Sequence, residues 1–577
     1  MCFRAKTAVF IAALWLGSAA ANLAAAQTTV TNTQELIAAV TNAAPGDVIE
    51  LDADTFELDG TLTIDRSDIT LRGRAGGTTT LVFNDRVMFG GVQTPLIDLS
   101  GQSNVVLRNL TLDGDNNAQG ASIGVFARNA SGLSLESLSI RNLTNDGTFA
   151  PIGVFFDGRV HDSVIRDSNL TDIGVADVFG SGIRIHGDSD GNLVEHNTID
   201  RGGRGGIFAQ GNPDNGDDFG QTFLENLTVR HNTVTNSALA DPALTGFADL
   251  GIEAQNDVRG LVVEDNTVDR RISLDNIQNA AVRGNTLTQA ENNTAARDIG
   301  FAGIEIVDTQ SFVATDNRVL AGVHIGLSIS GDGVTRNALF AGNTFEGATT
   351  FGVQIQGRDN DAAGIAGTAE QLLLLDNTIT GTTGGSDALF FPDFETGDGV
   401  RFNMAFDRIT LSGNTIGDNA GQDVFLNAAP ADSLVHFLGN TGVNENGDPA
   451  ALSLTGTGHL RITETSLTQQ TVEAELGDTL VLVFDDLGGT ITDVLWDPGD
   501  GVPFLTNGPE LLLDPAVIGD ARRLLAVGFD DTGTADTVLV QIVGSAPEPG
   551  AGLLLAAGIG LFTIRPSRRR EPCPSRL

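Results

Sequence analysis

Three carboxylates face outward in short segments of alternating polar and apolar residues, Glu253 and Glu305 at the first outward place and Asp275 at the second. Glu253 lies in GIEAQN, Asp275 in RRISLDN and Glu305 in GIEIVD. If these segments are successive turns of one coil with strands about 4.8 Å apart, Glu253 and Glu305 lie about 9.6 Å apart with Asp275 between them. Neighbouring carboxylates drive one another's pKa values apart, and an acid–base pair needs such a difference. These three residues are therefore the candidate catalytic residues.

Three interpretations of this acidic face stay open. A carboxylate separation of roughly 6.5–9.5 Å suits an inverting glycosidase, which places a water molecule between the base and the sugar. The same oxygens could instead hold calcium, a hard cation that prefers several oxygen ligands. The third interpretation is an acidic sheet that only faces solvent and performs no chemistry.

Charged and aromatic side chains occupy the corresponding places in earlier segments. Arg184 and His186 lie in GIRIHG, whereas Phe155 lies in GVFFDG and Phe208 in GIFAQG. Because alternate residues of a strand point to the same side, all four side chains are expected on the outer face of the coil. They combine charge with an apolar surface on which a sugar ring can stack, so we predict that they bind substrate.

The segment NPDNGDD offers a weaker candidate for metal binding. Its Asp214, Asp217 and Asp218 could bind calcium, or the segment could be a solvated turn. Calcium is the only cofactor for which the sequence offers ligands, and no phosphate-binding loop, HExxH or nucleophile-elbow motif stands out. His196 and His231 occupy the same place in their repeats, which favours a structural role over metal ligation.

A repeated Asn-Thr-apolar phrase, with Arg in place of Thr in one copy, organises the middle of the chain. Its copies are 19 to 37 residues apart, a range typical of one solenoid turn with its loops. Each copy follows alternating segments, and period-two alternation without helical periodicity indicates strands. In a coil of parallel strands the asparagines would stack, so that their amides link neighbouring turns while their backbones tolerate the angles of a bend. The repeated asparagines are Asn197, Asn232, Asn266, Asn285, Asn317, Asn343, Asn377 and Asn414.

These repeats resemble the right-handed parallel β-helix family, the pectin-lyase-like fold of many polysaccharide lyases and hydrolases. The resemblance covers about residues 29–462 and includes an amphipathic helix in TQELIAAVTNAAPGDVIEL, which in that family caps the open end of the coil. Family lyases that use lysine or tyrosine are excluded, because Lys6 is the only lysine and the chain has no tyrosine. An arginine base with calcium stays open, although the full motif set of the pectate-lyase branch is not found.

Residues 465–545 resemble a PKD-type, Ig-like β-sandwich. The segment WDPGDG, which begins at Trp496, matches that family's Trp-Asp-Phe-Gly-Asp-Gly turn except for proline at the third place. In the family such modules act as spacers or carbohydrate contacts, so no chemistry of its own is expected from this part.

Both ends of the chain carry sorting signals. Residues 1–26 have the charged, apolar and small-residue regions of a signal peptide, with cleavage expected after Ala26. Residues 546–577 resemble the PEP-CTERM sorting signal, a Pro-Glu-Pro triplet followed by a short apolar transmembrane segment and a basic cluster, which in its family an exosortase recognises. A simple membrane anchor is the alternative. The residues of this signal are Pro547, Glu548, Pro549, Arg568, Arg569 and Arg570.

Composition limits the partners. Asp and Glu outnumber Lys and Arg by 74 to 33 in 577 residues, a formal net charge of −41 that argues against nucleic acid. So acidic a surface suits high salt, divalent cations or neutral partners. The two cysteines, Cys2 and Cys573, lie in the terminal signals, so neither a disulfide nor a thiol nucleophile is expected in the body of the protein.

The sequence thus predicts an exported, all-β protein of the cell envelope or extracellular matrix. A parallel β-helix over 27–464 with an N-terminal capping helix precedes the β-sandwich and a C-terminal apolar helix. Expected partners are a polysaccharide matrix, an exosortase and, before processing, the membrane. A non-catalytic polysaccharide-binding role is slightly favoured because of the poor motif match and the missing lysine. The alternative is a glycoside hydrolase or calcium-dependent lyase acting on acidic glycans.

Overall fold

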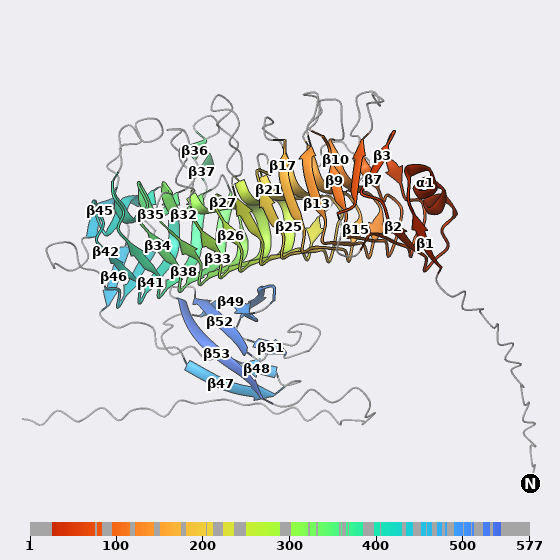
Figure 1. The fold of residues 1–577 in the computed structure, drawn as a ribbon. Coiled ribbons are helices and arrows are strands. Elements are labelled where there is room, and N and C mark those ends of the chain that lie inside the picture. Colours follow the sequence, from red (N-terminus) through yellow and green to blue (C-terminus); the bar gives the residue numbers. More distant parts are fainter. Residues whose placement is uncertain are drawn as a thin grey trace, which may run out of the picture.

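In the computed structural model the chain winds into a long solenoid of parallel strands, and a small separate module lies beside its C-terminal half (Figure 1). The structure describes residues 26–543 except for 75–77, 84–94, 116–121, 144–150, 175–179, 203–204, 212–222, 236–249, 289–301, 321–322, 331–332, 357–358, 361–364, 367, 385–396, 404–405, 430–433, 442–451, 457–458, 464–469, 476–478, 482–489, 500, 509, 513–522 and 531–534.

Each turn of the solenoid contributes strands to three parallel sheets. The first sheet contains β4 (Leu62–Thr63), β7 (Pro95–Asp98), β10 (Ile123–Ala127), β14 (Ile152–Asp157), β18 (Ser181–His186), β21 (Gly205–Gln210), the first halves of β25 (Leu250–Glu264) and β27 (Arg271–Arg283), β29 (Ala302–Val307), β32 (Ile325–Ser330), β35 (Phe351–Gln356), β40 (Asp398–Asn403), β43 (Val424–Ala429) and β45 (Leu452–Gly456).

The second sheet follows the first around each turn, and β25 and β27 run through both. It contains β1 (Gln27–Val30), β2 (Val48–Leu51), β5 (Thr70–Gly73), β8 (Val106–Arg108), β12 (Ser134–Glu136), β16 (Val164–Arg166), β19 (Leu193–Glu195), β23 (Thr228–Arg230), the second halves of β25 and β27, β30 (Gln310–Thr315), β33 (Val334–Ala341), β38 (Thr368–Leu375), β41 (Phe406–Ser412), β44 (Leu434–Leu438) and β46 (His459–Thr463).

The third sheet closes each turn and carries the threonines of the repeated phrase. It contains β3 (Thr55–Leu58), β6 (Thr80–Phe83), β9 (Thr111–Asp113), β13 (Ser139–Leu143), β17 (Asn169–Ile173), β20 (Thr198–Asp200), β24 (Thr233–Thr235), β26 (Thr267–Val268), β28 (Thr286–Leu287), β31 (Arg318–Val319), β34 (Thr344–Glu346), β39 (Thr378–Thr380) and β42 (Thr415–Gly417). Short ladders also form between β11 (Ala130–Ser131) and β15 (Val160–His161), and between β36 (Asp359–Asn360) and β37 (Ile365–Ala366).

Alternation along each strand decides which side chains fill the coil. In β18, for example, Ile183 and Ile185 are completely buried in the core while Arg184 between them points outward. Glycine is the second residue of many first-sheet strands, because neighbouring turns touch there. A Cβ atom on Gly153 would lie 2.4 Å from the carbonyl oxygen of Gly182 on the next turn, which no larger residue can tolerate. The glycine-led segments of the sequence are the result.

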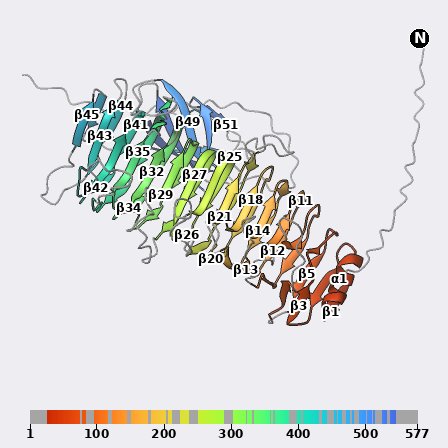
Figure 2. The ribbon, with the colours of Figure 1, turned by 90° about the horizontal axis from the view of Figure 1, so that it is seen from above.

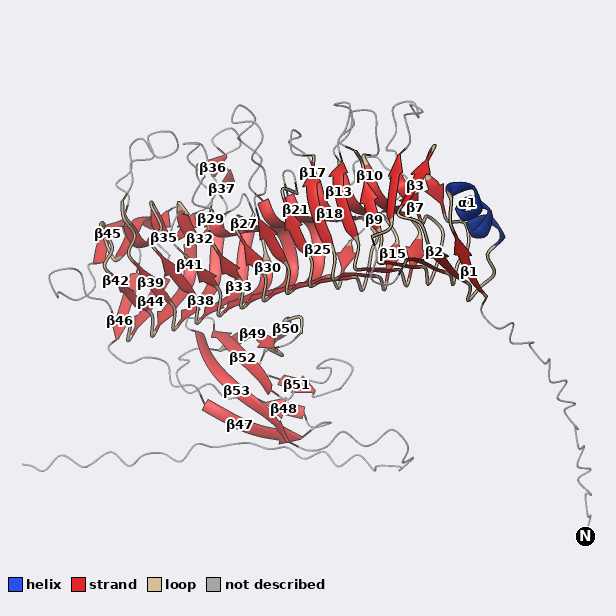
Figure 3. Ribbon diagram, viewed as in Figure 1, coloured by secondary structure: helices blue, strands red, loops and turns tan. Residues whose placement is uncertain are grey.

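One helix occurs among the described residues, and it lies at the N-terminal end of the coil (Figures 2 and 3). This helix, α1 (Thr33–Asn42), begins where the Asn32 side chain accepts a hydrogen bond from the backbone N–H of Glu35. The Glu35 carboxylate in turn accepts from the N–H of Thr31 at 2.7 Å. Leu36 and Val40 are buried against the core, so the helix predicted from the sequence is present and covers the first turns.

The C-terminal module forms a separate set of mostly antiparallel strands. A five-stranded sheet has the order β47 (Gln470–Glu475), β53 (Ala535–Val543), β52 (Arg523–Asp530), β49 (Ile491–Asp497) and β50 (Phe504–Asn507), while β48 (Thr479–Val481) pairs with β51 (Glu510–Leu512). Trp496 is completely buried and donates to the Thr506 hydroxyl at 2.8 Å. The resemblance to a PKD module stays a prediction.

The module packs against the outer face of the second sheet. Val313, Leu339 and Leu373 lie on adjacent turns, point outward and are fully buried under the module. We call these three residues the docking strip. Their partners in the module are Leu495, Val527, Phe529 and Ala535.

Polar contacts frame this docking strip. Gln371 donates to the Asp493 carboxylate at 3.1 Å, and the backbone N–H of Ala535 donates to the Thr410 hydroxyl at 3.3 Å. At the N-terminal edge, Arg283 forms a buried ion pair with Asp497 of the WDPGDG segment. Asp497 also accepts from the N–H of Gly499, so this turn both closes the module and attaches it to the solenoid.

Both predicted sorting signals lie outside the described residues, apart from Ala26. Among the residues that are described, no helix is long and apolar enough to cross a membrane.

Candidate functional site

The outer face of the first sheet carries the predicted site residues in two columns. The strand registers confirm the alignment expected from the glycine-led segments, since Phe155, Arg184 and Phe208 pair in sequence and Phe208 pairs next with Glu253. The first column runs Phe126, Phe155, Arg184, Phe208, Glu253, Ser273, Glu305, Ser328 and Gln354. The second runs Asp157, His186, Gln210, Gln255, Asp275, Val307 and Ser330.

The three predicted catalytic carboxylates are only partly brought together. Glu253 and Glu305 lie two turns apart in the first column, with Ser273 between them as the alignment of the segments predicts. Asp275 belongs to the second column, opposite Gln255 and Val307. Asp275 therefore lies on the turn between the two glutamates, as expected, but in the column beside theirs, because a strand residue two places along faces the same side in the next column.

Burial also differs from the exposed acidic face that the sequence suggested. Glu253 is only 7% exposed and Ser273 only 5%. The Oε2 atom of Glu305 accepts two hydrogen bonds, one from Arg271 and one from the Ser273 hydroxyl, each 2.8 Å long. This carboxylate is thus held by an ion pair within the sheet. The catalytic role of the three residues stays a prediction.

The described residues show no arrangement of side chains that could bind a metal ion. Asp214, Asp217 and Asp218 lie outside them. In the described part of the chain, no three His, Cys, Asp or Glu side chains come close enough together to hold a metal ion.

The four predicted substrate-binding residues form one cluster. The His186 ring lies edge-on between Phe155 and Phe208, with centroid distances of 5.1 and 5.7 Å. The Arg184 guanidinium stacks 4.9 Å from the centre of the Phe208 ring and donates to the Ser181 hydroxyl. Both phenylalanines are buried, so they support the imidazole rather than offer a free face to a sugar.

His186 is the chemically unusual member of this cluster. Its Nε2 atom is enclosed and has no hydrogen-bond partner, although the residue as a whole is partly exposed. Burial, together with the positive charge of Arg184, lowers the pKa of His186 to about 3. The imidazole is therefore neutral at neutral pH, and it can both donate and accept a hydrogen bond.

Neutral hydrogen-bonding groups continue along the second column. Gln210 and Gln255 follow His186 on the next two turns, and Asp157 and Asp275 lie at the two ends of this run. All five side chains are partly exposed. Within the part of the chain that the structure describes, the side-chain amides of Gln210 and Gln255 make no hydrogen bond. We call these five residues the polar strip.

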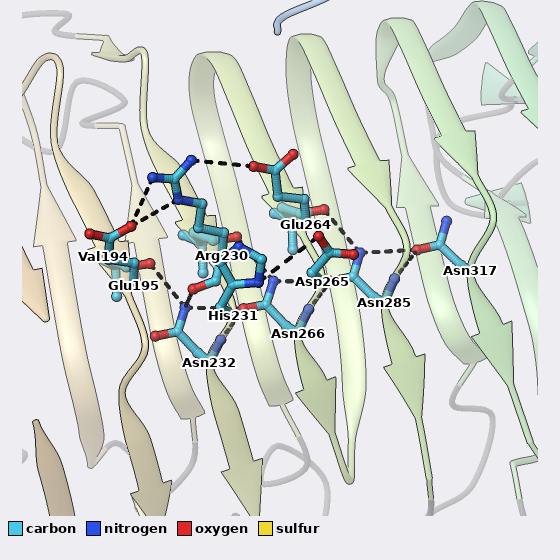
Figure 4. A network of polar contacts seen from close by, with 12 residues as sticks. Val194, Glu195, Arg230, His231, Asn232, Glu264, Asp265, Asn266, Asn285 and Asn317 are labelled. Carbon is cyan, nitrogen blue, oxygen red and sulfur yellow. Dashed lines mark hydrogen bonds and ion pairs between the residues drawn. The ribbon is translucent and has the colours of Figure 1, made fainter. Parts of the chain in front are cut away.

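The asparagine column is confirmed as an internal support (Figure 4). From Asn232 onward each Asn side chain accepts from the backbone and side-chain nitrogens of the preceding Asn and donates to a carbonyl near the corner, while Asn197 at the start accepts from the backbone N–H of Ser168. Asn285, for example, accepts from Asn266 and donates to the carbonyl of Val263 at 2.9 Å. The column runs on to Asn440, where the phrase reads Asn-Thr-Gly and therefore falls outside the Asn-Thr-apolar pattern.

The expected reason for asparagine at this corner needs correction. The residue with a positive φ is the one before each Asn, such as His196 (φ 55°), His231 (φ 54°) or Gly284 (φ 61°). The asparagines are selected for their buried amides, and the preceding position is selected for the left-handed angle. His196 and His231 stack with centroids 4.8 Å apart, consistent with a repeat position.

A charge ladder on the outer face of the second sheet was not recognised from the sequence. Acidic and basic residues alternate along much of one column, and Arg230 reaches both Glu195 at 2.8 Å and Glu264 at 3.8 Å (Figure 4). The ladder ends at Arg283, at the edge of the surface that the module covers, and the column continues with Thr315. Its members are Glu50, Arg72, Arg108, Glu136, Arg166, Glu195, Arg230, Glu264 and Arg283.

A signal for the docking strip was available in the sequence. The segments SFVAT, NALFA and QLLLL have apolar residues at the outward place in their centre and no charge at their last residue, which is the outward place where most earlier second-sheet strands carry a charge. A strand that is apolar on both faces is covered on both faces.

Comparisons with known proteins agree with this architecture. The sequence model of the family described as "Right handed beta helix region" matches residues 96–269, which is under a third of the chain. The solenoid is a right-handed parallel β-helix. No curated protein matches the sequence.

Several solved structures show a distant likeness to this chain. The A-module of a mannuronan C-5 epimerase from Azotobacter vinelandii is 16% identical, with a TM-score of 0.33, and the match covers 75% of this chain and 93% of that one. An α-1,3-glucanase catalytic unit from Streptomyces thermodiastaticus is 14% identical (TM-score 0.39; 68% and 69% covered). An exopolygalacturonase from Thermotoga maritima is 13% identical (TM-score 0.37; 67% and 92% covered).

Proposed function

We propose that this β-helix protein binds polysaccharide without cleaving it, through the polar strip on the outer face of its first sheet. The observation that carries the proposal is the run of His186, Gln210 and Gln255 on consecutive turns. These side chains offer hydrogen-bonding groups in a row with strand spacing of about 4.8 Å, a linear arrangement suited to a linear polymer. The buried rings of Phe155 and Phe208 hold the imidazole in place behind them.

The state of the carboxylates supports binding over catalysis. An acid–base pair needs two carboxyl groups free to exchange protons with a substrate between them. Here both Arg271 and Ser273 bind Oε2 of Glu305, and Glu253 is almost fully buried.

The location belongs to the same proposal. The signal-peptide pattern at residues 1–26 and the PEP-CTERM pattern at residues 546–577 support export to the envelope or matrix, with an exosortase and the membrane as transient partners. A polysaccharide matrix is then the available ligand at that location.

The test uses the chain from Gln27 to Gly544, which lacks both predicted sorting signals. It is incubated with acidic and neutral polysaccharides, with and without calcium, while pull-down measures binding and two assays measure reducing ends and the ultraviolet absorbance of unsaturated uronates. We expect binding without turnover. The triple variant His186→Ala, Gln210→Ala, Gln255→Ala should lose at least tenfold in affinity. The control Gln278→Ala, a partly exposed glutamine of β27 near the second sheet, should bind as the unchanged chain does.

One observation favours an enzyme instead: Glu253 and Glu305 are two turns apart on one column, about 9.6 Å by strand spacing. New reducing ends without absorbance would establish a hydrolase, and both signals together a lyase. Glu253→Gln or Asp275→Asn should then abolish turnover with little change in thermal stability. Turnover that survived both substitutions would show that the site lies elsewhere.

A further inference from the structure

We infer that the polar strip is built for an uncharged glycan and discriminates against polyanionic ones. This inference rests on the proposed function and adds the chemical class of the ligand to it. The strip is neutral at its centre, where His186, Gln210 and Gln255 occupy three consecutive turns. The side-chain amides of Gln210 and Gln255 each donate and accept hydrogen bonds, which matches sugar hydroxyls that also do both, and the neutral imidazole adds no charge beside them.

The ends of the strip reinforce this preference. Asp157 and Asp275 are one turn beyond His186 and Gln255 respectively, which makes the strip about 19 Å long by strand spacing. A carboxylate accepts a hydrogen bond from a sugar hydroxyl but repels the carboxylate or sulfate of an anionic sugar. A ligand that spans the whole strip therefore meets a carboxylate at each end, and the charge of the one at Asp157 is partly offset by Arg128.

The arginines on this face are already engaged by other groups. Arg128 forms an ion pair with Asp157, and Arg271 forms one with Glu305. Arg184 lies against the Phe208 ring. Proteins often recognise an anionic sugar through arginine guanidinium groups that hydrogen-bond to its carboxylate. Here the guanidinium groups of these three arginines contact partners within the chain instead.

A second arginine site further along the first sheet follows the same rule. Arg401 lies between the rings of Phe351 and Phe425, with centroid distances of 5.0 and 4.5 Å, and donates to the buried Asp398 carboxylate at 2.8 Å. Its charge is neutralised inside the protein rather than presented to a ligand.

The long-range field acts in the same direction. A formal net charge of −41 repels a polyanion before it reaches the sheet, most strongly at low ionic strength. At about 0.15 M salt the screening length is about 8 Å, so the local carboxylates still act on a bound polymer while the distant ones are largely screened. Neither the local carboxylates nor the long-range field repels an uncharged polymer.

The test compares polymers that differ only in charge. Dextran, pullulan and a linear β-1,3-glucan are each paired with their carboxymethyl derivatives, and dissociation constants for the same chain are measured by calorimetry at 20 and 150 mM salt. We expect the chain to bind at least one uncharged polymer, with less than a twofold effect of salt. Its carboxymethyl derivative should bind at least tenfold more weakly at 20 mM salt, and the gap should narrow at 150 mM.

A variant with added positive charge separates local recognition from the overall field. Gln210→Lys with Gln255→Lys adds two positive charges to a protein whose full sequence has a formal net charge of −41, so the overall field changes little. If the strip contacts the ligand, this variant should bind the carboxymethyl polymer at least tenfold better than the unchanged chain does. The control Gln278→Lys with Thr286→Lys adds the same charge away from the strip and should leave the preference as it was.

The outcomes separate the two proposals. Tighter binding of the carboxymethyl polymers by the unchanged chain would overturn the uncharged-glycan inference and leave polysaccharide binding intact. An equal effect of the strip variant and its control would overturn the strip as the recognition surface. Binding to none of the polymers, charged or uncharged, would overturn the proposed function and the inference with it.

Discussion

The contact between Arg283 and Asp497 joins residues 214 positions apart and gives the sharpest test of how the module is held. The Asp497→Ala substitution leaves the Arg283 guanidinium buried, with its Nε and Nη1 atoms already lacking partners. Removing one partner of a buried ion pair costs about 3–5 kcal/mol. We expect about 3 kcal/mol here, at the low end, because Glu264 on the adjacent turn offers Arg283 an alternative partner.

Tryptophan fluorescence can follow this loss in the module alone. Trp496 adjoins Asp497 and is fully buried, and the other of the two tryptophans, Trp15, lies in the predicted signal peptide. In a chain that begins at Gln27, fluorescence therefore reports the module while far-ultraviolet circular dichroism reports mainly the solenoid. For a domain of this size each kcal/mol lowers the unfolding midpoint by about 4–8 °C, so a fall of about 10 °C or more is expected in fluorescence.

Two further variants decide whether the ion pair is the cause. Arg166→Ala removes a ladder residue whose side chain is 43% exposed and whose pair with Glu136 should contribute only about 0–1 kcal/mol. Arg283→Met combined with Asp497→Leu replaces both charges by apolar groups and should restore most of the lost stability. If Asp497→Ala lowers the fluorescence midpoint no more than Arg166→Ala does, the pair does not hold the module and our account of the interface is wrong.

Two more predictions concern the solenoid itself. Asn285→Ala should lower the free energy of unfolding by about 2–6 kcal/mol, because the N–H of Asn266 and the carbonyl of Val263 lose buried partners worth about 1–3 kcal/mol each. Chemical denaturation measures this free energy. A loss no larger than that of Thr286→Ala on the same turn would refute the prediction. His186→Gln should change the pH dependence of stability. Because the pKa of His186 is lowered from 6.5 to about 3, the unfolded chain binds a proton that the folded chain does not between those pH values. The free energy of unfolding should therefore fall as the pH falls from 7 to 5, and this fall should be larger in the unchanged chain than in His186→Gln by on the order of 2 kcal/mol. Equal falls in the two chains would contradict a buried neutral imidazole.

The repeated local pattern of the sequence determined the fold of the solenoid and the register of its strands. The glycines at strand starts, the alternation after them and the asparagine at each corner are chemical requirements that recur on every turn, so each copy in the sequence supports the same interpretation. Gly153 is needed because the next turn is only one strand spacing away, and Asn285 because its neighbours in the stack are also asparagines. Repetition of this kind also fixes the register, and for that reason the two outward columns follow from the sequence alone.

Which outward-facing side chains of the solenoid are buried was decided only by the tertiary structure. The sequence placed Glu253 correctly on the outward column, yet nothing near it in the chain indicates that it is 7% exposed. The docking strip and the Arg283–Asp497 pair likewise depend on a module encoded far along the chain from the strands that it covers. Periodicity reports which way a side chain points, because that follows from the backbone of its own strand. Whether the side chain meets water or another part of the protein depends on residues far away in the sequence, and the local pattern holds no record of them.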